Sequence, residues 1–207
     1  MGGLAKSVEA TVAKRYGACL HKILELKSVI EDFRMHSLWG IKVGMEMFNL
    51  AILPQLLYNS DTWFEMTDQT LNRLESLQRI LLRCLLCVPN STPVAALSWD
   101  SRLLSIRYKI YQNKLMLIQH LMSLDRSSLA SEIFTLQKDF NLPGVVKEGR
   151  QLIKQFSLPN IIDEEQKLSK LQWQRLVKRT IYEAYGNYLT CVIASSSKLK
   201  DGPMVGE

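Results

Sequence analysis

Apolar residues recur with the spacing of an α-helix along most of the 207-residue chain. The clearest case lies near its end, where the members of one stripe stand three or four residues apart. They are Trp173, Leu176, Val177, Thr180, Ile181, Ala184, Tyr185 and Tyr188. This spacing places them on one face of a helix with about 3.6 residues per turn. No segment alternates convincingly between apolar and polar residues, so the sequence predicts an all-α protein.

The other predicted helices follow the same period and end at turn-forming residues. Their ranges are 4–32, 69–87, 101–123, 127–139 and 145–156, and Thr92 is a candidate cap of a short helix that runs to Leu97. Gly40 and Gly44 predict a turn or a loose helix start, and Pro54, which lacks an N–H donor, predicts a kink or a helix start. The expected architecture is a helical bundle of about six to eight helices with a long C-terminal helix.

The composition is that of a folded protein. Hydrophobic residues make up 47% of the chain and charged residues 22%, which excludes a disordered polyampholyte. Four cysteines are too few for a disulfide scaffold of this length, which favours a reducing compartment. No run of 18 uncharged apolar residues occurs, so we expect no membrane span. The resulting expectation is an intracellular protein of the nucleus or the cytoplasm.

Motifs for enzymatic or metal chemistry are sparse. Cys84 and Cys87 form a CxxC pair, but a structural zinc usually needs a second pair, so we expect both cysteines to pack in the core. Glycine-rich nucleotide-binding loops and the HExxH motif do not occur. The sequence therefore predicts no catalytic residue, no metal and no cofactor. An enzyme with an unrecognised site stays open, and it would need a pKa-shifted carboxylate or histidine in a cleft.

Positive charge is concentrated in two parts of the chain. The net charge of +6 arises from +5 in residues 73–114 and +4 in residues 166–207, offset by negative charge elsewhere. Basic blocks on helices suit contact with phosphates, because each neutralised phosphate releases a condensed counterion. A solvated helix face explains the same charge without any ligand.

The tryptophans allow two interpretations. Trp39, Trp63, Trp99 and Trp173 lie near helix ends or on apolar faces. Aromatic rings beside arginines can stack on bases, but we expect core packing for these four.

Several stretches carry motifs that occur together in one family. Leu56–Trp63 reads LLYNSDTW, Leu74–Arg83 reads LESLQRILLR and Val88–Pro93 reads VPNSTP. Further stretches are Ala96–Ile106, Lys114–Leu121 and Leu168–Leu189. In order and spacing they resemble the LLYNSETW, LExLQxxFLR, VPxSTP and later motifs that follow the catalytic core of non-LTR (LINE-type) retrotransposon reverse transcriptases. The last stretch resembles members with a downstream restriction-like endonuclease.

The resemblance implies a thumb and linker, without the polymerase centre. The family's catalytic carboxylates lie on a YADD-type palm motif, which the chain lacks and which would be expected upstream of Met1. The zinc knuckle and the endonuclease carboxylates would lie downstream. The chain departs from the family at Asp100–Arg102, where a Glu-Leu-Gly turn is usual. The implied domains are 1–66, a post-palm helical segment; 67–140, a thumb-like helical bundle; 141–194, linker helices; and 195–207, a tail expected to be disordered.

In that family the thumb grips the template–primer duplex by its backbone, and the resemblance gives the basic blocks the same role. The implied phosphate contacts on the thumb-like part are Arg79, Arg83, Arg107, Lys109 and Lys114. A second group on the linker helix consists of Arg175, Lys178 and Arg179. The implied partner is the backbone of RNA or of an RNA–DNA duplex, bound without catalysis.

Two rival hypotheses remain. The chain could be a helical protein-interaction module, or a domesticated or remnant retroelement product that does not bind nucleic acid. Removal of a palm would leave an apolar face, expected near Leu53, Leu56 and Leu57, and such a face recruits protein partners.

Overall fold

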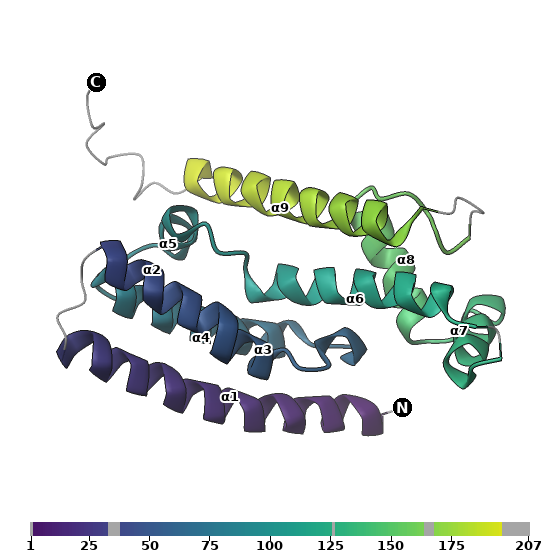
Figure 1. The fold of residues 1–207 in the computed structure, drawn as a ribbon, viewed down its shortest axis with the longest axis horizontal. Helices are drawn as coiled ribbons and strands as arrows, with labels where there is room; N and C mark the ends of the chain where they lie inside the picture. Colours follow the sequence, from purple (N-terminus) through teal and green to yellow (C-terminus); the bar gives the residue numbers. More distant parts are fainter. Residues whose placement is uncertain (1, 33–37, 126, 164–167, 196–207) are drawn as a thin grey trace.

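Helices dominate the computed structural model, which describes residues 2–32, 38–125, 127–163 and 168–195 (Figure 1). The α-helices are α1 Gly2–Asp32, α2 Leu38–Met47, α3 Leu53–Leu56, α4 Asp68–Leu86, α5 Val94–Ser101, α6 Ile106–Ser123, α7 Leu129–Asp139, α8 Val145–Gln155 and α9 Lys170–Ser195. A π-helical turn, Phe48–Ile52, joins α2 to α3, and a 3₁₀ turn, Ser60–Thr62, follows α3. No strand lies in the described ranges. The prediction of an all-α bundle with a long C-terminal helix is confirmed.

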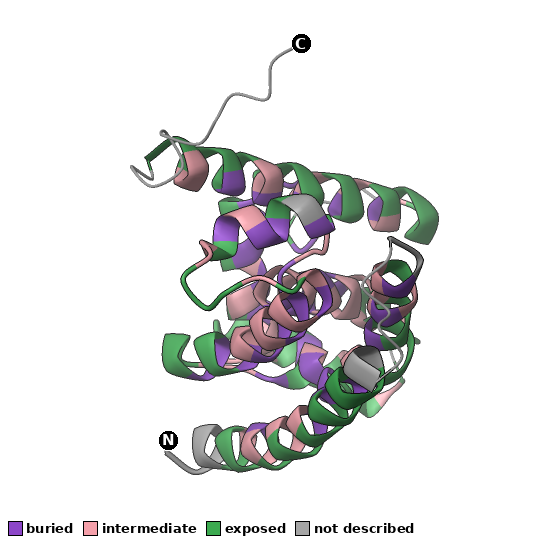
Figure 2. Ribbon diagram, turned by 90° about the vertical axis from the view of Figure 1, so that its left-hand side faces the viewer, coloured by how far each residue is buried: buried purple, intermediate pink, exposed green. Residues whose placement is uncertain are grey.

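The helix α6 occupies the middle of the bundle. Helices α1 and α9 lie at opposite edges, with α4 and α6 between them (Figure 1). Helix α4 packs against both α1 and α6, and α6 also packs against α8 and α9. Buried residues gather on the sides of the helices that face one another (Figure 2).

Two groups of buried apolar side chains form most of the core. The first lies between α1, α3, α4 and the start of α6, and Leu56 and Leu74 belong to it. The second lies between the rest of α6 and helices α7, α8 and α9, and Ile118 and Trp173 belong to it. The predicted boundaries at residues 66 and 140 stay predictions, although the first group takes side chains from both sides of residue 66 and the second from both sides of residue 140.

Helix α4 shows how local sequence sets a helix. The side chain of Thr67 accepts a hydrogen bond from the backbone N–H of Thr70 at 3.2 Å, as the prediction of a cap there requires. The helix ends at Leu86, and Cys87 follows in the left-handed conformation with φ 50°. Cys84 is partly buried against the first core group, but Cys87 is exposed. The expectation of a buried pair is therefore wrong for Cys87, because the helix ends before it.

Gly40 and Gly44 lie inside α2, which begins at Leu38, so the alternative of a helix start agrees with the structure and the alternative of a turn is wrong. A Cβ atom on Gly44 would lie 2.3 Å from Cδ2 of Leu85 on α4. The glycine lets α2 approach α4 closely, and this packing outweighs the low helix propensity of glycine.

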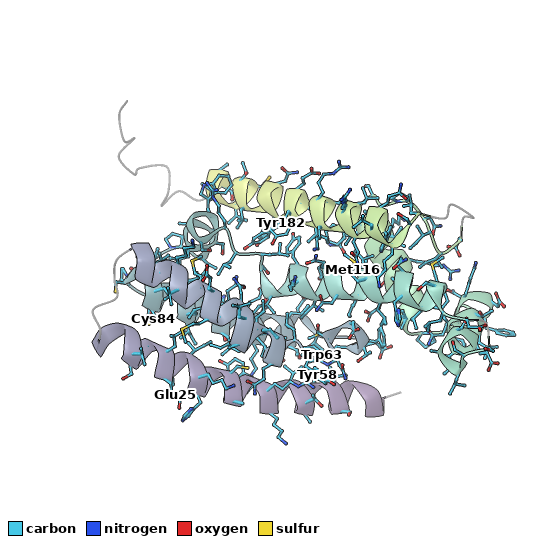
Figure 3. All side chains as sticks on the ribbon, in the orientation of Figure 1. Glu25, Tyr58, Trp63, Cys84, Met116 and Tyr182 are labelled. Atoms are coloured by element: carbon cyan, nitrogen blue, oxygen red, sulfur yellow. The ribbon has the colours of Figure 1, made fainter. Side chains whose placement is uncertain are left out.

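The LLYNSDTW stretch forms a joint between α1, α3 and α6. Asn59 adopts φ 54°, and the buried Ser60 accepts a hydrogen bond from the amide of Asn113 on α6 at 2.9 Å. The Arg15 guanidinium on α1 lies over the Tyr58 ring at 5.5 Å and the Trp63 ring at 5.4 Å (Figure 3). These contacts give this stretch a structural use within the chain.

The exposed apolar face expected near Leu53, Leu56 and Leu57 is not present. Leu56 and Leu57 are buried in the first core group, and Leu53 packs partly buried against it. The expectation failed because α1 packs against α3 and covers this segment.

Two remaining expectations concern the membrane and the tail. Among the described residues, no helix combines the length and the apolar character that crossing a membrane requires. The disorder expected for residues 195–207 lies outside the described residues, except for Ser195, which ends α9.

Candidate functional site

The C-terminal helix α9 places a basic face outward. Its buried stripe holds Trp173, Val177, Ile181, Tyr185 and Leu189, in agreement with the predicted periodicity. The Trp173 indole donates to the backbone oxygen of Leu115 at 3.0 Å and fixes the helix against α6.

The exposed side of α9 carries Arg175, Lys178, Arg179 and Tyr182 at spacings of three, four and seven residues. Such spacings place side chains on one helix face. The only acidic residue of Lys170–Ser195 is Glu183, whose carboxylate lies 3.8 Å from Arg179. Both partners are mostly exposed, so this pair is weak and leaves the arginine accessible. Tyr182 is 53% exposed beside this face (Figure 3).

The structure brings the two basic blocks of the sequence together at α6 and α9. Lys109 is partly buried, and its ammonium donates to Oε1 of Gln112 at 3.0 Å. Burial, and then the positive charge of Lys178, lower the pKa of Lys109. The charge of Lys178 thus adds to the cost of charging Lys109, and a bound anion would offset it.

Two residues of the first predicted group are used inside the fold. Arg107 donates to Oδ1 of Asp68 at 2.7 Å and to Oδ1 of Asn72 at 3.1 Å. Lys114 is 7% exposed, and its ammonium lies 2.5 Å from Oε2 of Glu148 on α8. These carboxylates already satisfy the two cations, so neither is presented freely to a phosphate.

Arg83 and Arg79, which belong to the same group, differ from each other. Arg83 donates from Nη2 to the backbone oxygen of Asn90 at 3.0 Å and thereby holds the loop that follows α4. Arg79 donates to the backbone oxygen of Asn72 at 3.3 Å. Among the described residues no carboxylate pairs with Arg79, so its guanidinium keeps donors that can reach a ligand.

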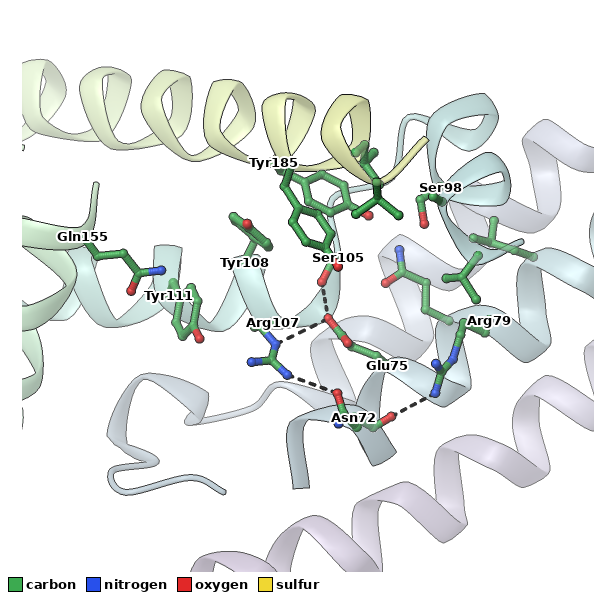
Figure 4. A pocket seen from close by; sticks show the side chains of 17 residues that line it. Asn72, Glu75, Arg79, Ser98, Ser105, Arg107, Tyr108, Tyr111, Gln155 and Tyr185 are labelled. Atoms are coloured by element: carbon green, nitrogen blue, oxygen red, sulfur yellow. Dashed lines mark hydrogen bonds and ion pairs between the residues drawn. The ribbon is translucent and has the colours of Figure 1, made fainter. Parts of the chain in front are cut away.

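A cleft of about 480 Å³ lies between α4, α5, α6 and α9 (Figure 4). Its lining combines tyrosines with charged and polar side chains. The tyrosines are Tyr108, Tyr111, Tyr185 and Tyr188, and the charged residues are Glu75, Arg79 and Arg107. The sequence prediction missed this cleft, because the two tyrosine pairs stand far apart in the chain. The only signal was that each pair has the i, i+3 spacing of one helix face.

The tyrosines of the cleft form one cluster. Ring centroids of Tyr108 and Tyr185 lie 4.9 Å apart, and Tyr185 and Tyr188 are nearly parallel at 6.4 Å and 17°. Burial is the main cause that raises the pKa of Tyr108 and of Tyr185. Both phenols are therefore neutral at physiological pH and can donate hydrogen bonds.

The acidic side of the cleft is occupied by the protein's own groups. Glu75 accepts a hydrogen bond from the Ser105 hydroxyl at 2.5 Å, and its carboxylate lies 3.9 Å from Nε of Arg107 (Figure 4). This leaves Arg79 as the cleft's least engaged charge.

The tryptophans divide between the two interpretations. Trp63 and Trp173 are buried, so core packing is confirmed for them. Trp99 is 52% exposed, so the core prediction is wrong for this residue. The side chain of Trp39 lies outside the described residues.

The described residues contain no group of three potential metal ligands from histidine, cysteine, aspartate and glutamate. The comparisons identified no protein-family model, curated protein or solved structure that matches this chain.

Proposed function

We propose that this protein is a non-catalytic helical domain that binds the sugar–phosphate backbone of an RNA–DNA duplex or of RNA. The binding surface is the outward face of α9, formed by Arg175, Lys178 and Arg179, together with Lys109 of α6. The single observation that carries the proposal is the row of exposed cations Arg175, Lys178 and Arg179 on one face of α9, a helix whose one acidic residue is Glu183.

The chemistry of this face suits phosphates better than other partners. Its guanidinium and ammonium groups are exposed, and one weak pair with Glu183 is its only acidic contact in the described part of the chain. Arginine donates to phosphate oxygens in a fork geometry, and lysine adds a point charge. Contacts of this kind position a duplex and carry no sequence information. The resemblance to a reverse transcriptase thumb and linker supports the same role.

The proposed contact surface differs from the one that the sequence predicts. Arg107 and Lys114 serve as ion-pair partners inside the fold, and Arg83 holds a loop. The second group, on α9, becomes the principal surface. Arg79 lies apart from it, in the cleft between α4 and α9.

Filter binding of a short RNA–DNA hybrid across a series of KCl concentrations tests this function. The logarithm of the binding constant should fall linearly with the logarithm of the salt concentration, with a slope of about −0.9 for each phosphate contact. An absence of binding at low salt, or an affinity that salt does not change, contradicts the proposal.

A second candidate function, a protein-interaction module, is favoured by one surface. Helix α7 and the residue that caps its end expose a stripe of apolar side chains: Leu129, Ile133 and Leu136 of α7, and Phe140. The partner that suits this stripe is α7 of a second copy. An antiparallel pair would place Glu132, in the first turn, opposite Lys138, in the last turn.

Light scattering after size-exclusion chromatography separates the two candidates. Self-association through α7 requires a dimer that Leu129→Ser and Leu136→Ser together convert into a monomer. A protein that stays monomeric at every concentration tested excludes this second function, whereas duplex binding by α9 is unaffected by that result.

A further inference from the structure

The cleft between α4, α5, α6 and α9 is separate from the basic face of α9. Its volume of about 480 Å³ lies within the range of small-molecule sites, which is roughly 300–1,000 Å³. Arg175, Lys178 and Arg179 are not among its lining residues. The function proposed for α9 therefore does not account for it.

One wall of the cleft is aromatic. Tyr108 and Tyr185 are in ring contact, and Tyr188 continues the cluster while remaining 54% exposed. An exposed ring at the edge of a cleft leaves a π-face available to a planar ligand. Stacking of a nucleobase on such a ring contributes about 1–3 kcal/mol and tolerates any base.

The facing wall, from α4 and the start of α6, is polar and cationic (Figure 4). Arg107 and Glu75 already engage each other, with Asp68 and Ser105 as further partners. Arg79 donates to one backbone oxygen, and the structure gives it no carboxylate partner among the described residues. This arrangement suits an anion, because the cleft's one carboxylate is engaged and a guanidinium is left with open donors.

We propose that this cleft binds one unpaired nucleotide, with its base against Tyr108 and Tyr188 and its phosphate at Arg79. The nucleotide can be free or can be the unpaired end of a strand, since both offer the same base and phosphate.

Isothermal titration with a nucleoside 5′-monophosphate and with a short single-stranded oligonucleotide tests the site. Arg79→Gln should weaken binding about tenfold or more, because it removes a charged hydrogen bond to phosphate. Tyr188→Ala should weaken it about tenfold, whereas Tyr188→Phe, which keeps the ring, should restore most of the affinity. Binding of the monophosphate identifies a free nucleotide as ligand, and binding of the oligonucleotide alone identifies a strand end.

Two controls separate loss of this site from a general loss of positive charge and from misfolding. Lys14→Gln removes an exposed charge of α1, outside both the cleft and the basic face of α9, and should leave nucleotide affinity unchanged. Circular dichroism melts check that Arg79→Gln and Tyr188→Ala remain folded. Failure of both ligands to bind, binding that neither variant weakens, or tighter binding of choline than of the nucleotide overturns the proposal. None of these results bears on duplex binding, because that is measured separately by its salt dependence.

Discussion

Lys114 illustrates at the scale of one residue why a basic side chain need not meet a ligand. Its ammonium pairs with Glu148 on α8 and lies 5.6 Å from the centre of the Phe64 ring. Glu148 in turn accepts the backbone N–H of Glu65 at 2.5 Å. The pair therefore ties the segment before α4 and the helices α6 and α8 together.

Replacing one member of the Lys114–Glu148 pair should lower the free energy of unfolding more than replacing both. Lys114→Met leaves the Glu148 carboxylate without its cation, so we expect a loss of about 3 kcal/mol in the free energy of unfolding. The double variant Lys114→Met/Glu148→Gln should lose much less, because the introduced amide keeps an oxygen for the Glu65 N–H and carries no charge. Urea denaturation of the singles and the double gives the coupling. Additive losses would show that the pair does not act as a unit.

The lowered pKa of Lys109 predicts that the free energy of unfolding depends on pH. Its folded-state pKa is lowered, chiefly by burial and then by Lys178, so the folded state binds this proton less tightly than the unfolded chain. The resulting destabilisation is fully present below the folded pKa and disappears as pH rises toward the ordinary lysine value of about 10.4.

Lys109→Met should therefore unfold at higher urea than the unchanged protein at neutral pH. The difference should shrink when pH is raised through the alkaline range below about 10.4. A difference that is constant with pH would contradict the assigned cause. The same substitution should weaken duplex binding although it stabilises the fold, so the weaker binding cannot be attributed to unfolding.

At the scale of the helix, the glycines fall into two kinds: some lie at a close contact between helices, and others have open space around them. A Cβ atom on Gly149 of α8 would lie 2.3 Å from Cδ1 of Ile118 and 3.3 Å from Cδ1 of Ile162. Gly17 of α1 and Gly186 of α9 have nothing within 4 Å of such an atom. The same change of glycine to alanine should therefore have opposite effects on stability at these two kinds of position.

Gly17→Ala and Gly186→Ala should each stabilise the protein by up to about 1 kcal/mol through better helix propensity. Gly149→Ala should destabilise it by about 1 kcal/mol, because crowding in the buried contact outweighs the same gain. Thermal denaturation of the three variants checks the signs. A higher Tm for Gly149→Ala would show that α6 and α8 can move apart without cost.

The helical period predicted most of the elements because it reports which faces are buried, and burial is what the fold stabilises. The prediction failed where the backbone conformation of a single residue sets the end of a helix. The helix predicted over 101–123 begins later than expected: α5 runs to Ser101, Arg102 turns with φ 52°, and α6 begins at Ile106. Side-chain pattern carries no information on a non-glycine residue with positive φ.

At the scale of the whole molecule, the candidate surfaces depend on which helices meet. Periodicity placed Arg175, Lys178 and Arg179 off the buried stripe of α9, and the structure leaves them exposed. It did not predict that the charge of Lys178 on α9 helps to lower the pKa of Lys109 on α6, or that tyrosines from α6 and α9 join in one cleft, because these interactions link residues far apart in sequence.

Helix α9 is 26 residues long, or about 39 Å at the rise of an α-helix, and lies at an edge of the bundle (Figure 1). A duplex can therefore approach its outer face without displacing another described helix. The face is joined to the core through Trp173 and Leu115, so it presents its charges from a fixed support.

The salt dependence of RNA–DNA hybrid binding by paired variants tests the central claim most directly. Arg175→Gln/Lys178→Gln removes two charges from the α9 face, and Lys14→Gln/Lys147→Gln removes two exposed charges from α1 and α8. The account predicts that the α9 pair reduces the magnitude of the salt slope by about two, while the control pair leaves it nearly unchanged. Equal slopes for both variants would contradict α9 as the duplex-binding surface.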